Sequence, residues 1–198
     1  MNIFFFFSVL NSVIFFIESR GIEEDYLKLY LTFLFMFDPQ KAHYIVVTGI
    51  LVRSGKYLIV KRSEKEKSFP SMWTVPGGKL EVSDYSSRSK DAGDFWYNVF
   101  ESALKREVLE ETGLEIKNIR YLTSLSYIRS DGIPTIIVSM FCEDTGGTIH
   151  LCDDLSEFSW VSLEEAKKYS LIDGIYDELV LLDNLLKGGV LGEWKKSS

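Results

Sequence analysis

The residues best suited to chemistry in this 198-residue chain are three closely spaced glutamates, Glu107, Glu110 and Glu111. An α-helix advances about 100° per residue, so on a helix the three side chains fall within an arc of roughly 100° and converge on a common volume. Three nearby carboxylates repel one another, and partial burial would raise their pKa values unless a cation were present. Their oxygens suit a divalent ion such as Mg²⁺ or Mn²⁺.

A metal ion held in this way can neutralise a diphosphate and lower the pKa of a bound water that attacks phosphorus. The pattern therefore indicates pyrophosphate hydrolysis. The alternative for the three glutamates alone is the solvated face of a charged helix, which is what such runs usually form. The surrounding residues favour chemistry: Gly77 and Gly78 precede the helix, Arg106 can pair with Glu110 one turn away, and Gly113 closes the helix.

The sequence pattern predicts that these residues are positioned by a strand-rich sheet interrupted by helices. Leu104 and Val108 form an apolar stripe beside the glutamates that would hold their helix against the sheet. We expect helices over residues 95–112, with Asp94 as N-cap, over 174–186, and after a capping box of Ser162 and Glu165. We expect strands at residues 44–52, 56–60, within 68–78, and at 114–128, 133–142, 148–152 and 158–161.

The sequence segments at residues 76–81 and 106–114 resemble the signature of the Nudix hydrolases. That signature is Gly, five residues, Glu, seven residues, then Arg-Glu-apolar-x-Glu-Glu-x-Gly-apolar. Residues 106–114 match at every specified position, and Gly78 fits the opening glycine. Asp84, however, stands where the family has Glu, and 21 residues rather than seven separate it from Arg106, an insertion of 14. We interpret the insertion as a lengthened, exposed loop over residues 85–93.

The resemblance spans residues 44–186 and implies an α/β fold, the Nudix-type α/β/α sandwich with a mixed sheet. It also implies cleavage of a nucleoside diphosphate linked to another group: a nucleotide, an oxidised nucleotide, an ADP-ribose-like molecule or a nucleotide sugar. Carried over by position, Glu107, Glu110 and Glu111 are the catalytic residues and Mg²⁺ ligands, with Mn²⁺ as the other candidate ion. The carbonyl of Gly77 is implied as a further ligand.

The same resemblance extends to residues outside the signature. Arg62 and Lys79 occupy positions that would face substrate phosphates, although an ordinary exposed basic residue fits both positions equally well. A further acid from a loop beyond the box is implied, and Asp154 and Glu157 both stand in that region. A non-catalytic nucleotide-sensing module on the same fold is the alternative function, and retention of all three helix carboxylates argues against it.

Composition limits the remaining function classes. Hydrophobic residues make up 46% of the chain, and the net charge is −7 with no basic block, which disfavours a broad nucleic-acid surface. Cys142 and Cys152 are too few for a disulfide scaffold or a four-ligand zinc site. We expect reduced thiols in a cytoplasmic protein that acts on a small nucleotide-type substrate.

The start of the chain is separate in character, because 8 of the 14 phenylalanines fall in the first 35 positions. Residues 3–17 form an uncharged run that is shorter than the ~20 residues needed to span a bilayer. We predict a hydrophobic extension at 1–40, a Nudix domain at 41–190 and a tail at 191–198. Three interpretations of the extension compete: translated upstream sequence with Met36 as the true start, a covering or homodimer-forming helix, and an interfacial membrane helix.

Overall fold

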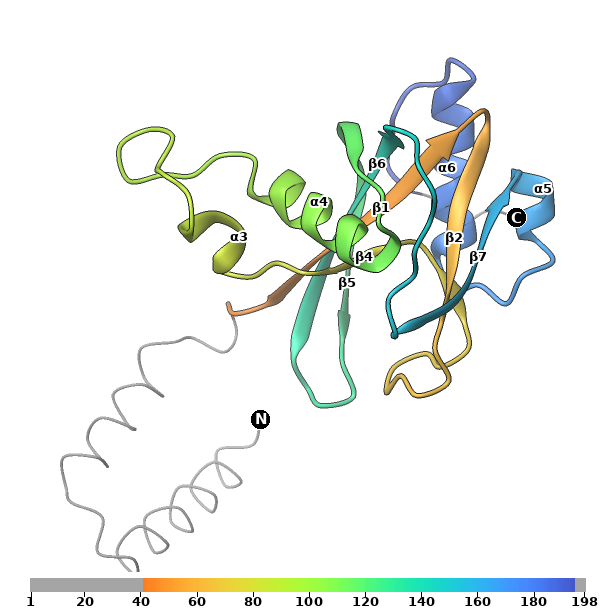
Figure 1. Cartoon of the computed structure of the whole chain (residues 1–198), viewed down its shortest axis with the longest axis horizontal. Helices are drawn as coiled ribbons and strands as arrows, with labels where there is room; N and C mark the ends of the chain where they lie inside the picture. The colour runs from red at the N-terminus through yellow and green to blue at the C-terminus, as the bar shows by residue number, and fades with distance from the viewer. Residues whose placement is uncertain (1–40, 195–198) are drawn as a thin grey trace, which may run out of the picture. The chain divides into compact units, whose positions relative to one another are not determined.

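The computed structural model describes residues 41–194 (Figure 1). The expected hydrophobic extension, the start at Met36 and the end of the tail lie outside the described residues. The strands are β1 (Tyr44–Arg53), β2 (Lys56–Arg62), β3 (Trp73–Thr74), β4 (Gly77–Lys79), β5 (Ile116–Ile128), β6 (Pro134–Asp144) and β7 (Leu155–Val161). The helices are α3 (Ser83–Ser86), α4 (Val99–Thr112), α5 (Leu163–Ala166) and α6 (Ile175–Leu186).

The strands form a mixed sheet, as the sequence predicts. Its order is β3-β2-β1-β6-β5, with β7 on β2 and β4 on the first half of β1. The β1–β6 pair is parallel and the other pairs are antiparallel. Because β2 pairs with β1 only near the hairpin, the start of β1 is free to bind β4, which carries the two glycines before the catalytic helix.

Alternate residues of β1 point to two separate cores, which makes the domain three-layered. Val47 and Leu51 pack in one core with Leu104 and Val108 of α4. Ile50 packs in the other core with residues of α6, including Leu179. Figure 1 shows α4 and α6 on opposite sides of the sheet. Leu104 and Val108 are fully buried, which confirms the apolar stripe that anchors the catalytic helix.

The catalytic helix begins at Val99, so the expected start near Asp94 is wrong. The contacts of Asp91 explain why the helix begins later. The Asp91 carboxylate accepts a hydrogen bond from the backbone N–H of Tyr97 at 2.8 Å, and the backbone N–H of Asp91 donates to the Phe95 carbonyl. These contacts hold the chain in a turn, and Asn98 then enters α4 with a φ of 54°. The short helix α3, which begins before Asp84 and ends within the expected loop, is also not predicted by the polar sequence.

The strand expected at residues 148–152 is also absent from the structure. In its place the backbone N–H of His150 donates to the Thr112 carbonyl at 2.9 Å, and that of Cys152 donates to the Glu111 carbonyl at 3.2 Å. The segment therefore satisfies carbonyls at the carboxyl end of α4, which have no partner inside the helix. It packs over the helix end that carries Glu111.

Several local predictions are confirmed. The hairpin between β1 and β2 turns at Ser54 and Gly55, both with positive φ. Gly113 terminates α4 with a φ of 71°, and its N–H donates to the Leu109 carbonyl. Ser162 and Glu165 form the reciprocal capping box that opens α5.

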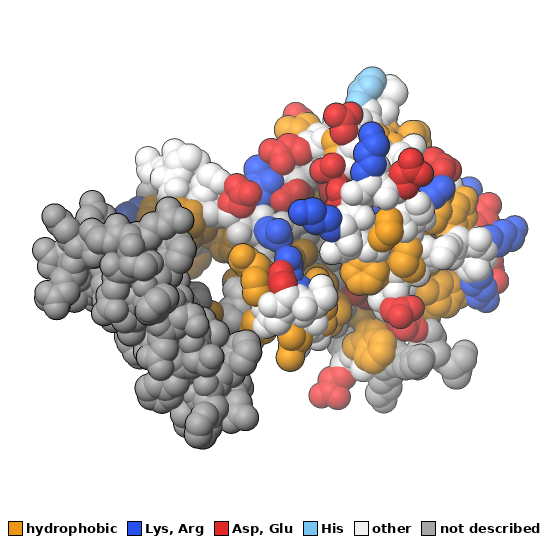
Figure 2. Space-filling model, turned by 90° about the horizontal axis from the view of Figure 1, so that it is seen from below, with side chains coloured by type: hydrophobic (Ala, Val, Ile, Leu, Met, Phe, Trp, Pro, Cys, Tyr) orange, Lys and Arg blue, Asp and Glu red, His pale blue; other side chains and the backbone are white. Residues whose placement is uncertain are grey.

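Two further observations concern the helices and the surface charge of the described domain. Within residues 41–194 no helix is long and apolar enough to cross a membrane. On the face shown in Figure 2, acidic and basic side chains of the described domain are interspersed.

Candidate active site

Glu111 lies at the centre of the candidate site. Its carboxylate accepts a hydrogen bond of 2.9 Å from the backbone N–H of Gly77, which joins the last turn of α4 to β4. The pKa of Glu111 is raised to about 7, mainly by burial; the charges of Glu107 and Asp154 also raise it, while the Gly77 N–H and Arg62 lower it. Glu111 is therefore a carboxyl group crowded by other acids, with one hydrogen-bond donor and one nearby cation.

Glu107 lies one turn earlier on α4, and its side chain is 14% exposed. Burial also raises the pKa of Glu107, against the attraction of Arg106. Its carboxylate occupies the space that a side chain on Gly78 would take, since a Cβ built there would lie 2.2 Å from an oxygen of Glu107. Gly77 is similarly confined, because a Cβ there would lie 2.2 Å from the Val47 carbonyl oxygen. Gly78 is thus required for the loop to approach the helix, and Gly77 for its close packing against β1.

Arg106 connects the loop to the helix through Asp84. The Arg106 guanidinium donates to the two Asp84 oxygens at 2.5 and 3.2 Å, to the Lys79 carbonyl at 3.0 Å and to Glu110 at 3.0 Å. Although burial opposes it, the hydrogen bonds from Arg106 and the Glu81 backbone keep the pKa of Asp84 below its usual range. The shorter acid at position 84 therefore makes the contact that joins loop and helix across the insertion.

The three helix glutamates differ in exposure. Glu110 is 59% exposed and paired with Arg106, as the sequence predicts. Within residues 41–194 no three acidic, histidine or cysteine side chains lie close enough to form a ready-made cation site. Glu110 is thus the most exposed of the three, and one nitrogen of Arg106, Nη1, lies 3.0 Å from its carboxylate and 3.0 Å from that of Glu107.

The residues nonetheless fit a divalent cation. Glu107 and Glu111 supply hard oxygen ligands, and both have raised pKa values that a positive ion would reverse. Glu110 could join them by giving up its contact with Arg106, which would keep Asp84 and the Lys79 carbonyl as partners.

The structure separates the two candidate downstream acids. Asp154 is close enough to Glu111 to raise its pKa, and its carbonyl accepts a hydrogen bond from Ser63 at 2.8 Å. The Glu157 carboxylate instead pairs with Lys61 at 2.7 Å on the neighbouring strand. Asp154 is therefore the acid that the fold brings to the glutamates.

The two candidate basic residues also differ. Arg62 acts electrostatically on Glu111, and its guanidinium is held by the Ser68 carbonyl at 2.8 Å and by Glu66. The ammonium of Lys79 lies 5.6 Å from the centre of the Tyr44 ring. Arg62 is thus placed beside the glutamates, whereas the contacts of the Lys79 side chain point to Tyr44.

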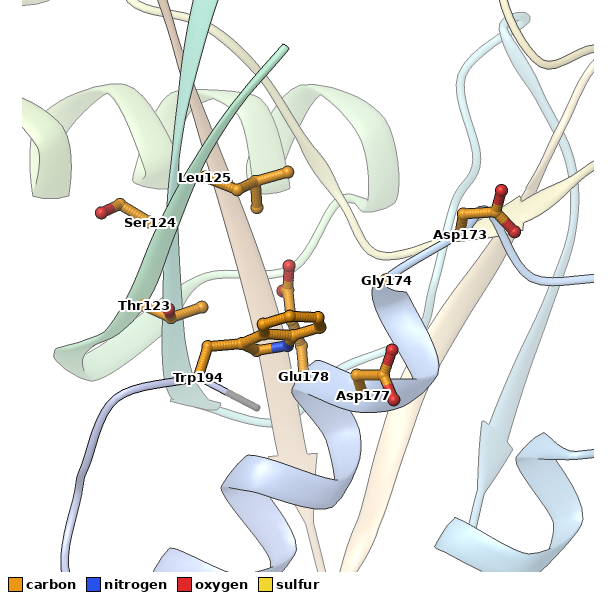
Figure 3. Close-up of a pocket in the computed structure, with 8 residues that line it drawn as sticks. All are labelled: Thr123, Ser124, Leu125, Asp173, Gly174, Asp177, Glu178 and Trp194. Atoms are coloured by element: carbon orange, nitrogen blue, oxygen red, sulfur yellow. The ribbon is translucent and has the colours of Figure 1, made fainter. Parts of the chain in front are cut away.

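Sequence reasoning missed a pocket on the α6 side of the sheet (Figure 3). It has a volume of about 510 Å³ and is lined by Thr123, Ser124, Leu125, Asp173, Gly174, Asp177, Glu178 and Trp194. One signal was present in the sequence: Glu178 follows Ile175 by three positions and precedes Leu182 by four, so it lies on the apolar face of the final helix. A buried acid on such a face often marks a functional position.

Comparison with known proteins agrees with this fold. The model of the NUDIX domain family matches residues 43–180. The chain belongs to the NUDIX domain family and is a Nudix-type pyrophosphohydrolase, an enzyme that acts on acid anhydrides. Enzymes of this family generally use divalent metal ions and act on small nucleotide substrates.

Individual relatives are more distant. The chain is 28% identical over 136 residues to the nucleoside triphosphatase NudI of Salmonella agona, covering 64% of this chain and 86% of NudI. The crystal structure of a MutT NUDIX hydrolase from Burkholderia pseudomallei is 20% identical, with a TM-score of 0.57 over 72% of this chain and 99% of that one. An ADP-ribose pyrophosphatase from Streptococcus suis is 18% identical, with a TM-score of 0.54 over 74% and 93%. These two structures support the fold.

Proposed function

We propose that this protein is a Mg²⁺- or Mn²⁺-dependent hydrolase that cleaves the pyrophosphate bond of a nucleoside triphosphate or of a nucleoside diphosphate linked to another group. The observation that carries the proposal is the position of Glu111, held by the Gly77 N–H while Glu107 and Asp154 crowd it with like charge. Such crowding destabilises ionised carboxylates unless a cation shares the site.

Glu107, Glu111 and the Gly77 carbonyl would hold the ion, with Glu110 as a further ligand once released from Arg106. When bound, the ion neutralises phosphate charge and acidifies a coordinated water. In the reaction a water oxygen bonds to phosphorus, the anhydride P–O bond breaks, and the released phosphate leaves with the electron pair of that bond. The proton from water is accepted by a carboxylate of the site, for which Glu107, Glu111 and Asp154 are candidates.

Other residues of the chain position the reacting groups. Arg62 lies beside Glu111 in a conformation fixed by Ser68 and Glu66, so it is placed to attract a substrate phosphate. Arg106 fixes the loop that carries Gly77 and Gly78 through Asp84 and the Lys79 carbonyl. Holding the groups before substrate arrives lowers the entropic cost of reaching the transition state.

The substrate is best identified by a product-resolved screen. Nucleoside triphosphates come first because NudI is a nucleoside triphosphatase; oxidised nucleotides, ADP-ribose and nucleotide sugars follow. We expect metal-dependent release of pyrophosphate or of a nucleoside monophosphate, strongly reduced in Glu111→Gln. Tight binding without turnover across the whole panel would instead support a nucleotide-sensing module.

We also propose that the protein works in the cytoplasm. Cys142 and Cys152 are both unpaired thiols in the described structure, which suits a reducing compartment. Thiol trapping in intact cells should show both cysteines reduced, and a disulfide in the isolated native protein would contradict this location.

A further inference from the structure

The second half of β5 is an open edge of the sheet. Among the described residues β5 pairs only with β6, so the other side of the strand has no strand beside it. In the first half, Lys117 and Arg120 and two irregularities of the pairing interrupt this edge. Residues 123–128 contain no charge, proline or glycine, and they pair with β6 without interruption. Charges and bulges are the usual protection of an edge strand, so only the first half of β5 is protected.

The hydrogen bonds of the β5–β6 hairpin show which backbone groups point away from β6. The Arg129 N–H donates to the Ile133 carbonyl at 3.1 Å, and bonded and non-bonded pairs alternate along the antiparallel strands from there. Pro134, which has no N–H, stands at a non-bonded position in this alternation. The backbone groups that face outward are therefore those of Ser124, Ser126 and Ile128. A strand placed against β5 can form hydrogen bonds with all three residues.

The exposed side chains of this half are apolar on one face of the sheet. Leu125 and Tyr127 are 40% and 39% exposed, and both lie on the face against which α6 packs, where Leu125 lines the pocket. Figure 3 shows the side chains of Thr123 and Leu125 on the pocket side of β5 and that of Ser124 on the other side. At the end of the strand Ile128 is 75% exposed. The open edge thus combines unpaired backbone groups with uncovered apolar side chains.

A second copy of β5, paired antiparallel about Ser126, complements both features. Ser126 would face Ser126 of the partner subunit, and Ser124 would face Ile128 of the partner subunit, so all the outward backbone groups of residues 124–128 gain partners. Leu125 would lie opposite Tyr127 of the partner subunit, and the same contact would form again across the two-fold axis. Aromatic residues opposite aliphatic ones stabilise strand pairs. The strand is therefore complementary to itself.

Charge and register also favour this partner. The chain has a net charge of −7, and residues 123–128 carry no charge that would repel a second copy. Moving the partner strand by two residues would place Leu125 opposite Arg129 of the partner subunit in one direction, and Tyr127 opposite Thr123 of the partner subunit in the other. A two-fold pair of edges closes on itself and does not continue into a fibre.

We propose that residues 123–128 of β5 are a docking surface for a second copy of this chain, which joins the two sheets by antiparallel pairing about Ser126. Because Leu125 lines the pocket beside α6, Tyr127 of the partner subunit extends the apolar wall of that pocket. A contact of two short strands is smaller than the roughly 1,200–2,000 Å² of stable interfaces, so the dimer depends on protein concentration. The inference goes beyond the proposed hydrolase function and does not depend on it.

The test is self-association of the full chain, measured by sedimentation equilibrium from about 1 to 200 µM. Ser126→Lys and Ser126→Glu each place like charges opposite each other at the two-fold axis, so each variant should associate at least about tenfold more weakly than the wild type. An equimolar mixture of the two variants should regain dimers, because opposite charges then face each other. Ser89→Lys, at an exposed position in the inserted loop, is the matched control and should associate like the wild type.

Hydrogen exchange gives a second measurement that needs no variant. In the wild type the N–H groups of Ser124, Ser126 and Ile128 should exchange more slowly at about 200 µM than at about 1 µM. Equal exchange at both concentrations, or a wild type that stays monomeric, would overturn the inference. Association that both Ser126 variants leave unchanged would also overturn it, because another surface would then form the contact. Two folded variants whose mixture stays monomeric would contradict pairing about Ser126.

Discussion

Two buried or partly buried carboxyl groups, Glu111 and Glu178, lie on opposite sides of one sheet and differ in their partners. Burial raises the pKa of both. Glu178 faces the neutral Ser139 hydroxyl, and its proton relieves the cost of burial. Glu111 faces Glu107 and Asp154, so adding one proton leaves other negative charges in place. A single proton can therefore neutralise the Glu178 site, whereas the proposed cation would be needed to offset the charges around Glu111.

The largest effect on activity is expected at Glu111, the carboxyl group that other acids surround. Glu111→Gln keeps the shape of the side chain and removes a charged ligand, so we expect kcat to fall on the order of 10³-fold, roughly 4 kcal/mol of barrier. The free energy of unfolding should not decrease, because a source of repulsion with Glu107 and Asp154 is lost. Steady-state kinetics and urea unfolding test both statements, and full activity would contradict the role of Glu111.

Gly78→Ala tests whether the loop must approach the helix closely. The added Cβ would overlap the Glu107 carboxylate and displace it. Displacement of a catalytic group by about 1 Å can cost on the order of 10²-fold in rate. We expect that loss in kcat while circular dichroism still shows a folded domain; activity within about twofold of wild type would show that Glu107 is free to move.

Asp84→Ala removes the partner that ties Arg106 to the loop. Asp84 has a side chain that is 1% exposed, while that of Arg106 is 27% exposed, so we expect a loss of about 2 kcal/mol in the free energy of unfolding. Asp131→Ala, which breaks the exposed pair with Arg129, is the control and should cost clearly less stability. Equal losses would show that the Asp84 contact has no special structural role.

Glu178→Gln gives the smallest effect and separates the two carboxyl sites by pH. The native pKa of Glu178 is raised, so the folded protein keeps this proton at pH values where the unfolded chain has released it. Its contribution to stability therefore falls as pH rises above about 4.3, the ordinary glutamate value. Urea unfolding between pH 4 and 8 should show a shallower decline in Glu178→Gln than in the wild type; parallel curves would contradict burial as an uncharged acid.

Much of this arrangement can be predicted from short-range patterns. The helix with Leu104 and Val108 facing the sheet, the Gly113 terminus and the Arg106–Glu110 pair all follow from helical spacing, because they depend on residues within one or two turns. The family signature pointed to Glu107 and Glu111 because residues 106–114 match it at every specified position, although the spacing to the loop differs.

The remaining features depend on contacts between distant residues. Asp84 reaches Arg106 across the insertion, and residues 148–152 satisfy the end of α4 instead of forming a strand. Trp194 lines a pocket whose other walls lie on β5 and α6. Helical and strand periodicity carries no information on such pairings.

The central claim, that the acids around Glu111 form a divalent cation site, is tested most directly by Mn²⁺ binding to the full chain, measured by calorimetry without substrate. The account predicts binding to the wild type and to Glu178→Gln, and strongly weakened binding to Glu111→Gln. Mn²⁺ bound equally by Glu111→Gln and wild type, or weakened as much by Glu178→Gln, would contradict it.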